Sequence, residues 1–304
     1  MKQTSIALLT DTIGKSNVLL NESMNKHTTF RVGGNAACFV TPGDETQLTQ
    51  VFHILREQDE SYYVLGNGSN LLVSDQGYDG CVVQIDRNMG TVAIRDNLLT
   101  ASAGALLSQI ANAAYKNGLT GLEFASGIPG TVGGAMVMNA GAYGGEMKQI
   151  VESVRVLTQD GQIIELSCDE MEFGYRTSII KKMPYVVLSA NLRLIRGDMS
   201  EIKARMDELK EQRITKQPLE YPSAGSTFKR PEGYFAGKLI EDAGLRGYAI
   251  GGAQVSEKHC GFVINKGNAT AGDIYQLITH IREEVFRTSG VMLEPEVCML
   301  GEFC

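Results

Sequence analysis

Gly66-Asn67-Gly68-Ser69-Asn70 and Gly127-Ile128-Pro129-Gly130-Thr131-Val132-Gly133-Gly134-Ala135 are two glycine-rich stretches of this 304-residue chain, and each follows an apolar, strand-like segment. Because glycine has no Cβ, it lets successive backbone N–H groups turn toward one point. Such a group of donors binds phosphate without a basic side chain. Two of these stretches in one chain predict a pyrophosphate, and therefore a dinucleotide-like ligand.

The composition is that of a globular protein, with 43% hydrophobic and 21% charged residues. A net charge of −7 argues against a nucleic-acid partner. No apolar stretch is long enough to span a membrane, and the run Ile6 to Leu9 is too short for a signal peptide. The six cysteines show no CxxC spacing. The sequence therefore predicts a cytoplasmic protein with reduced thiols.

One segment of this acidic chain is basic. Between residues 213 and 238 only Glu220 and Glu232 oppose five basic residues, which are Arg213, Lys216, Lys229, Arg230 and Lys238. A local positive field in an acidic protein predicts a small anionic ligand. The alternative is an ordinary solvated surface.

The pattern of apolar residues predicts an alternation of helices and strands. Helices are expected over 44–58, 106–117, 198–213, 235–243 and 270–288. Strands are expected over 28–40, 62–65, 71–73, 81–85, 91–95, 151–158, 162–166, 185–195, 261–264 and 291–300. Asp160-Gly161 predicts a hairpin between two of these strands. A capping sequence and a charged helical segment begin at Asp198, and we expect the main domain boundary there. An earlier division is expected near residue 90.

Common nucleotide and metal motifs are not found in the sequence. Neither glycine stretch spells G-x-G-x-x-G, the signature of a Rossmann dinucleotide site. There is no HExxH among the four histidines, and no spaced Cys/His cluster indicates zinc. The sequence therefore predicts no metal site.

Several motifs taken together resemble one family, the UDP-N-acetylenolpyruvoylglucosamine reductases of peptidoglycan precursor synthesis. The matching segments run in the family's order from about residue 28 to the C-terminus. They are the two glycine stretches, Thr28–Gly34, Asn139–Gly144, Gly174-Tyr175-Arg176, Pro222–Lys229, Ala253–Ser256 and Leu293–Val297. The glycine loops are shared with a wider class of FAD oxidases, whereas Ala224–Lys229 and Leu293–Val297 are more specific. The interval from Arg176 to Ser226 resembles the branch that lacks an extra tyrosine-bearing loop.

The resemblance implies an α+β fold with a vanillyl-alcohol-oxidase-type FAD-binding domain. Its two α/β subdomains would occupy residues 1–90 and 91–198, and a smaller α/β substrate domain would occupy residues 199–304. FAD would be bound non-covalently. The residues that the resemblance assigns to FAD are Gly66, Asn67, Gly68, Ser69, Asn70, Leu71, Ile128, Pro129, Gly130, Thr131, Gly133, Gly134, Ala135, Asn139, Gly141 and Ala142.

The implied reaction reduces UDP-N-acetylglucosamine enolpyruvate to UDP-N-acetylmuramate, with a hydride passing from NADPH through N5 of FAD. The resemblance assigns Ser226 as the donor of the final proton. It places Arg176 and Glu296 where negative charge develops on the substrate carboxylate, and a forked guanidinium suits that task. Without the resemblance, Ser226 is a turn serine, Arg176 a surface ion-pair partner and Glu296 a solvated carboxylate.

The resemblance also assigns substrate contacts. Arg213 and Lys216 match basic residues near the UDP diphosphate, and Lys229 is a further candidate. His259 is either a substrate contact or a structural histidine. Arg230 follows Lys229 where the family often has Asn. No obligatory protein partner is inferred. Two alternatives remain from the sequence: another FAD oxidoreductase of the same fold, and a non-catalytic nucleotide-binding protein.

Overall fold

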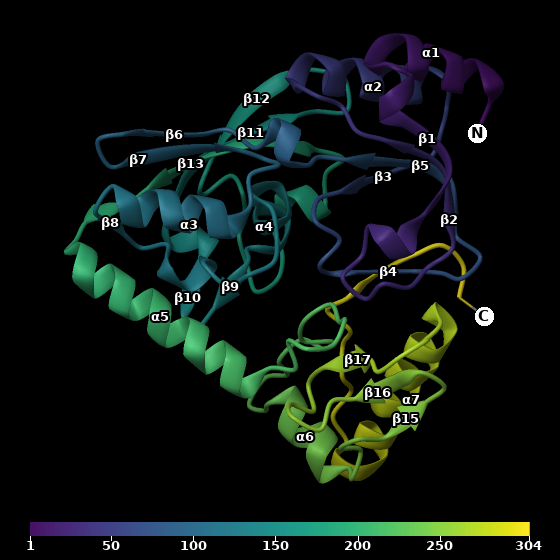
Figure 1. Ribbon diagram of the computed structural model, residues 1–304, viewed down its shortest axis with the longest axis vertical. Helices are drawn as coiled ribbons and strands as arrows, with labels where there is room; N and C mark the ends of the chain where they lie inside the picture. The colour runs from purple at the N-terminus through teal and green to yellow at the C-terminus, as the bar shows by residue number, and fades with distance from the viewer. Residues whose placement is uncertain (304) are drawn as a thin grey trace. The chain divides into compact units, whose positions relative to one another are not determined.

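The computed structural model describes residues 1–303, which fall into two compact units. Unit 1 comprises Met1–Leu19, Cys38–Asn67 and Gly80–Arg213, and unit 2 comprises Leu20–Ala37, Gly68–Asp79 and the chain from Ile214 onward. The three domains expected from the sequence, with boundaries near residues 90 and 198, are a different division and stay a prediction. Figure 1 shows the course of the chain.

Most of unit 1 is built on a five-stranded antiparallel sheet in the order β12-β11-β13-β7-β6. Its strands are β6 (Val92–Arg95), β7 (Leu98–Ser102), β11 (Val151–Leu157), β12 (Ile163–Ser167) and β13 (Val186–Arg193). Helices α3 (Leu107–Lys116) and α4 (Val132–Met138) lie on one side of this sheet (Figure 1). Strands β11 and β12 form the hairpin predicted around Asp160-Gly161, in which Leu157 pairs with Ile163.

A second sheet has the order β1-β2-β5-β3. Its strands are β1 (Val18–Ser23), β2 (Asn35–Val40), β3 (Tyr62–Leu65) and β5 (Tyr78–Gln84), of which β3 and β5 run parallel. Helices α1 (Gln3–Ile13) and α2 (Glu45–Glu57) pack together in unit 1. The short strands of this unit are β8 (Leu119–Thr120), β9 (Gly141–Ala142), β10 (Gly145–Glu146) and β14 (Ile195–Arg196).

Unit 2 has its own buried core, in which α7 (Ala271–Ser289) packs on the three-stranded sheet β15-β16-β17 (Figure 1). The strands of this sheet are β15 (Ala249–Ile250), β16 (Ala253–Val255) and β17 (Val263–Asn265), and α6 (Ala236–Asp242) packs on α7. Strands β4 (Leu71–Val73) and β18 (Cys298–Leu300) pair in parallel. Helix α5 (Met199–Lys216) belongs to unit 1 as far as Arg213.

The structure corrects two predicted strands. Residues 28–40 contain a strand only from Asn35, because Arg31 takes a positive φ of 57° that interrupts an extended backbone. Residues 291–300 contain a strand only from Cys298. The five predicted helices are confirmed, whereas α1 and the seven-residue α4 were missed.

Asp198 begins α5 by accepting hydrogen bonds from the backbone N–H groups of Ser200 and Glu201, as its capping sequence predicts. Among residues 1–303, no helix is long and apolar enough to cross a membrane. The cysteines of this range, Cys38, Cys81, Cys168, Cys260 and Cys298, are free thiols, and Cys304 lies outside the described residues.

Candidate functional site

The second glycine stretch leads into helix α4 through Thr131. The Thr131 hydroxyl caps this helix by accepting from the N–H of Gly134 at 3.3 Å. The N–H groups of Val132 and Gly133 donate to the carbonyls of Ala105 and Ala103, each at 2.8 Å. The first N–H groups of α4 are therefore already paired within the protein.

The two glycine stretches meet within unit 1. The Asn67 side-chain amide donates to the Pro129 carbonyl at 2.8 Å. A Cβ on Gly66 would lie 2.5 Å from the Thr131 hydroxyl oxygen, closer than real Cβ contacts. Gln84, on β5, donates to the Gly66 carbonyl at 3.2 Å. The sequence predicted both stretches as ligand loops, and the structure brings Gly66 and Asn67 against residues 129–131.

The rest of the first glycine stretch belongs to unit 2. Gly68 has a positive φ of 61°, and its carbonyl accepts from the N–H of Thr29 at 3.1 Å. Asn70 donates through its side chain to the Glu296 carbonyl at 3.1 Å, and Leu71 begins β4. Hydrogen bonds to Thr29 and to Glu296 therefore fix this part of the loop within unit 2.

Several backbone N–H groups of the two glycine stretches have no acceptor among residues 1–303. Within residues 1–303, no acceptor takes a hydrogen bond from the N–H groups of Asn67, Gly68, Ser69 and Asn70. The same holds in this range for Gly127, Gly130 and Thr131. Grouped N–H donors of this kind suit a phosphate. In unit 1, Asn67, Gly127, Gly130 and Thr131 therefore offer donors that suit a phosphate, and in unit 2 Gly68, Ser69 and Asn70 offer donors of the same kind. The N–H groups of Gly133, Gly134 and Ala135 are used inside the protein.

Arg176 lies against the predicted cofactor segment of unit 1. Its guanidinium donates to the Gly141 carbonyl at 3.1 Å and lies 5.1 Å from the centre of the Tyr175 ring. Arg176 itself has a positive φ of 56°. Such a backbone is uncommon for a residue with a side chain and is often found at functional sites.

Asn139 and the hairpin after it support this arrangement. Asn139 ends α4 in the left-handed conformation and is buried. Its side chain donates to the Gly174 carbonyl at 3.1 Å and accepts from the Lys148 N–H at 2.9 Å. Gly141 and Ala142 form β9, which pairs with β10. The Asn139 side chain therefore connects the end of α4 to the segment that carries Arg176.

Ser226 and Glu296 lie on two adjacent segments of unit 2. The N–H of Glu296 donates to the Thr227 carbonyl at 2.8 Å, and Phe228 bridges Pro295. Thr227 is fully buried, and its hydroxyl accepts from the N–H of Val263 at 2.9 Å. Ser226 is exposed beside this anchored residue. The structure therefore brings together two of the three predicted catalytic residues, which are seventy positions apart in the sequence.

The predicted substrate contacts have different surroundings. Lys229 forms an ion pair with Glu294, and its backbone N–H donates to the Glu294 carbonyl at 2.9 Å. Lys216 is exposed, and within the described part of the chain no acidic group pairs with it. Arg213 is partly buried against Gly127 in unit 1.

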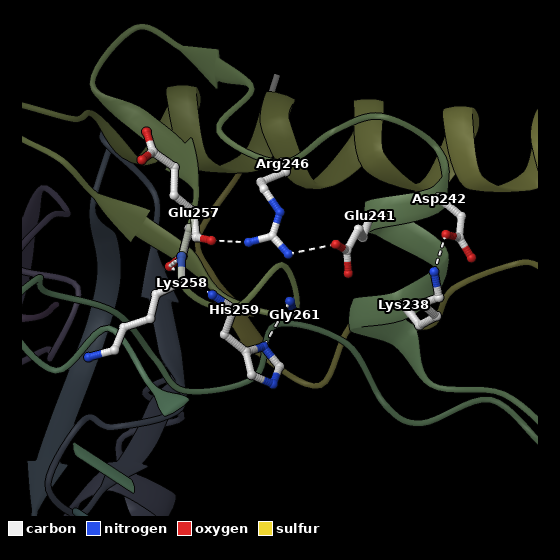
Figure 2. Close-up of polar contacts among 9 residues, drawn as sticks. Lys238, Glu241, Asp242, Arg246, Glu257, Lys258, His259 and Gly261 are labelled. Carbon is white, nitrogen blue, oxygen red and sulfur yellow. Dashed lines mark hydrogen bonds and ion pairs between the residues drawn. The ribbon is translucent and has the colours of Figure 1, made fainter. Parts of the chain in front are cut away.

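His259 is held as a neutral imidazole. The Gly261 N–H donates to its Nδ1 at 3.0 Å (Figure 2). Burial lowers the pKa of the His259 side chain, and its ring packs edge-on against Phe262. With Nδ1 accepting, the proton is on Nε2, which leaves one N–H donor.

The predicted basic segment is partly neutralised in the structure. Figure 2 shows Lys238 paired with Asp242, and Arg246 joined to Glu241 and to the Glu257 carbonyl. The Arg230 guanidinium lies 4.0 Å from the centre of the Phe235 ring. The acids that pair with Lys229 and Lys238 lie outside residues 213–238, and the charge count over that segment therefore left them out.

Sequence reasoning missed the roles of Tyr175 and Asp75. The Tyr175 ring faces the Arg176 guanidinium, and only the neighbouring Gly174 and Arg176 marked this position. The Asp75 carboxylate accepts from the N–H groups of Ala271 and Gly272 at the start of α7, at 2.9 and 2.7 Å. Nothing local in the sequence connects Asp75 with a helix almost two hundred residues later. Residues 1–303 contain no group of three or more His, Cys, Asp and Glu side chains that could hold a metal.

Two family models and several full-length relatives match this chain. Residues 36–167 match a family model described as an FAD binding domain. Residues 217–300 match the C-terminal domain of UDP-N-acetylenolpyruvoylglucosamine reductase. The reductase of Clostridioides difficile is 55% identical over 97% of both chains. That of Agathobacter rectalis is 50% identical over the full length of both.

Solved structures agree on the fold. The UDP-N-acetylenolpyruvylglucosamine reductase of Thermus caldophilus is 36% identical and has a TM-score of 0.81, over 93% of this chain and 98% of that one. An alkyldihydroxyacetonephosphate synthase, 13% identical, has a TM-score of 0.51 over 64% of this chain and 41% of that one. That likeness concerns the fold alone. The predicted α+β fold with a vanillyl-alcohol-oxidase-type FAD-binding domain is confirmed.

Proposed function

The chain belongs to the family of UDP-N-acetylenolpyruvoylglucosamine reductases, and on that premise we propose that it reduces UDP-N-acetylglucosamine enolpyruvate to UDP-N-acetylmuramate with NADPH. It is an FAD-dependent oxidoreductase. The proposal extends to a role in peptidoglycan precursor synthesis in the cytoplasm, without a nucleic-acid or membrane partner. The observation that carries it is the pairing of the Ser226 and Glu296 segments, because the two most specific sequence motifs meet there.

When bound, FAD would supply the redox chemistry, which is the transfer of a hydride from NADPH to the vinyl carbon of the substrate. The residues that would hold it in unit 1 are Asn67, Gly127, Gly130 and Thr131, whose backbone N–H groups have no acceptor among residues 1–303. Gly68, Ser69 and Asn70 are the proposed contacts from unit 2. Backbone donors can approach a pyrophosphate closely because glycine leaves the space open. The other residues assigned by resemblance, including Ile128 and Pro129, would line the same cofactor.

Ser226 is the proposed proton donor. Hydride addition leaves negative charge on the substrate carboxylate and on the carbon beside it. A serine hydroxyl is a weak acid, but an enolate-like carbon is basic enough to take its proton when the two are in hydrogen-bond reach. The exposure of Ser226 beside the buried Thr227 supports this role, since Thr227 fixes the backbone while the neighbouring hydroxyl remains accessible.

Arg176 and Glu296 are proposed to stabilise the developing charge. The positive φ of Arg176 and its hydrogen bond to Gly141 fix the direction of a forked cation that suits a carboxylate. Glu296 would act in its protonated form, as a donor to the same charge. Lys216, Lys229 and His259 are the proposed substrate contacts. For Lys229 this requires that the substrate compete with Glu294.

Two anaerobic half-reactions test the proposal. NADPH should bleach the flavin of the purified protein, and UDP-N-acetylglucosamine enolpyruvate should restore its absorbance. Another FAD oxidoreductase of this fold would be reoxidised by a different substrate and not by this one. A protein without flavin absorbance would be the non-catalytic nucleotide-binding alternative.

Ser226→Ala separates the proposed proton donor from the rest of the site. Flavin reduction by NADPH should keep its rate, because that step needs no proton from Ser226. Reoxidation by the substrate should slow by about 100-fold or more. Ser223→Ala is the matched control, since it removes one hydroxyl from the same loop and should leave both steps unchanged. Equal slowing of both steps in Ser226→Ala would mean that the loop only shapes the site.

A further inference from the structure

Arg213 is a partly buried cation without a protein counter-charge. Over the described residues 1–303, no carboxylate, carbonyl or hydroxyl accepts a hydrogen bond from its guanidinium. Burial lowers its pKa, and the phenol of Tyr143 is the group that opposes this shift. A guanidinium removed from water without a partner costs free energy, and an anionic ligand can compensate for that cost.

The Arg213 side chain lies along the beginning of the second glycine stretch. A Cβ on Gly127 would lie 3.1 Å from Cδ of Arg213 and 3.5 Å from its Nη1. Both residues belong to unit 1, and Gly127 lies inside the range that matches the FAD binding domain. The absence of a side chain at position 127 therefore leaves room for the arginine to reach over this stretch.

The backbone N–H groups near Arg213 are neutral donors and cannot by themselves balance the charge of a pyrophosphate. The helix after the stretch cannot offer its first N–H groups, because Ala105, Ala103 and Thr131 accept hydrogen bonds from them. Gly127, Gly130 and Thr131 contribute three neutral N–H donors that have no acceptor among residues 1–303. A pyrophosphate carries full negative charge, and a guanidinium binds phosphate oxygens in pairs. Arg213 is the positive charge that the structure places on this stretch.

We propose that Arg213 binds the pyrophosphate of FAD and not the diphosphate of the UDP-sugar, to which the resemblance assigned it. The inference rests on the proposed function only in taking FAD as the cofactor. Lys216, three residues further along the chain, is exposed and belongs to the other unit, and it remains the proposed contact of the substrate. Two neighbouring basic residues therefore serve two different phosphate ligands.

The test measures FAD affinity and substrate KM separately. Apoprotein carrying Arg213→Met should bind FAD about 10- to 100-fold more weakly than the wild type, the usual loss for a charge-assisted contact. Met keeps most of the stem that covers Gly127 and removes the charge. Arg213→Lys should recover part of the loss. FAD affinity of the wild type should fall as KCl rises, and that dependence should be weaker in Arg213→Met.

Steady-state kinetics at saturating FAD complete the test. KM for the UDP-sugar should stay at the wild-type value in Arg213→Met and should rise in Lys216→Ala, which should bind FAD normally. Normal FAD affinity together with a raised KM in Arg213→Met would overturn the inference and return Arg213 to the substrate. FAD affinity equal to the wild type in Arg213→Met but reduced in Arg213→Ala would also overturn it, because only packing would then matter. If FAD binds as expected and the enolpyruvyl substrate is not reduced, the proposed function fails and the inference stands.

Discussion

Gly68→Ala should lower the free energy of unfolding more than the same substitution at a positive-φ glycine where a Cβ would meet no other atom. Gly68 has a φ of 61°, in the left-handed region where a residue with a Cβ costs about 1–2 kcal/mol. The new Cβ would also lie 1.9 Å from the carbonyl oxygen of His27 and 3.0 Å from Cα of Thr28. These are backbone atoms, and a rotamer change cannot move them away.

The size of the effect follows from the two terms together. The contact at 1.9 Å requires segment 27–28 to shift by about 1 Å, and forcing extra atoms into a packed region costs about 1–3 kcal/mol. The expected total is about 2–5 kcal/mol of unfolding free energy. Because the N–H of Gly68 is a proposed FAD contact that has no acceptor among residues 1–303, the same shift should weaken FAD binding by at least about tenfold.

Gly244→Ala is the matched control. Gly244 has a φ of 75°, and a Cβ there would meet nothing within 4 Å. Its substitution should cost only the backbone term, about 1–2 kcal/mol, and leave FAD affinity unchanged. Urea unfolding of both apoproteins and titration of each with FAD measure the two quantities. Equal losses of stability in the two variants, with normal FAD binding by Gly68→Ala, would refute this reasoning.

Three further predictions concern unit 2. Lys216→Ala should raise KM for the UDP-sugar by about tenfold and leave flavin reduction by NADPH unchanged; an unchanged KM would remove Lys216 from the substrate site. Asp75→Asn should destabilise the protein by about 1 kcal/mol in urea unfolding, because a single amide oxygen replaces the two carboxylate oxygens that accept from Ala271 and Gly272. Hydrogen bonds from the backbone N–H groups of Thr270 and Gly252 lower the pKa of Asp273 in the folded protein. The ionised Asp273 should therefore stabilise the fold fully above its unfolded-state pKa, near pH 4, and this stabilisation should be lost as pH falls through the lower folded-state pKa. Asp273→Asn should therefore weaken the acid dependence of stability in that range, and an unaltered pH profile would contradict this assignment.

Local patterns predicted what local forces determine. The hairpin at Asp160-Gly161 and the start of α5 at Asp198 are both encoded within a few residues, and the structure confirms them. Helix α4 was missed because glycines fill its first turn, and glycine disfavours helix. Tertiary contacts compensate: the carbonyls of Ala103 and Ala105 accept its first N–H groups.

The candidate site could be predicted in its residue types but not in its contacts. Both glycine stretches were expected to be ligand loops. The structure divides the first of them, because Gly66 and Asn67 contact the second stretch while Gly68 packs on His27. Ser226 and Glu296 were assigned separately by resemblance, and only the folded chain shows that Thr227 accepts a hydrogen bond from Glu296. Such pairings depend on segments far apart in sequence, which no periodicity reports.

The net charge of a sequence segment does not predict the charge that the segment presents to a ligand in the folded protein. The sequence around Lys229 and Lys238 has a net positive charge, but Glu294 and Asp242 neutralise these two lysines in the fold. Arg213, at the edge of the same segment, has no such partner among the described residues 1–303 and lies on Gly127. A cation acts on a ligand to the extent that the protein leaves it unpaired, because an ion pair cancels most of its field. Arg213 and Lys216 therefore keep more of their charge for a ligand than Lys229 and Lys238 do, and substitution of the first two should change affinity more.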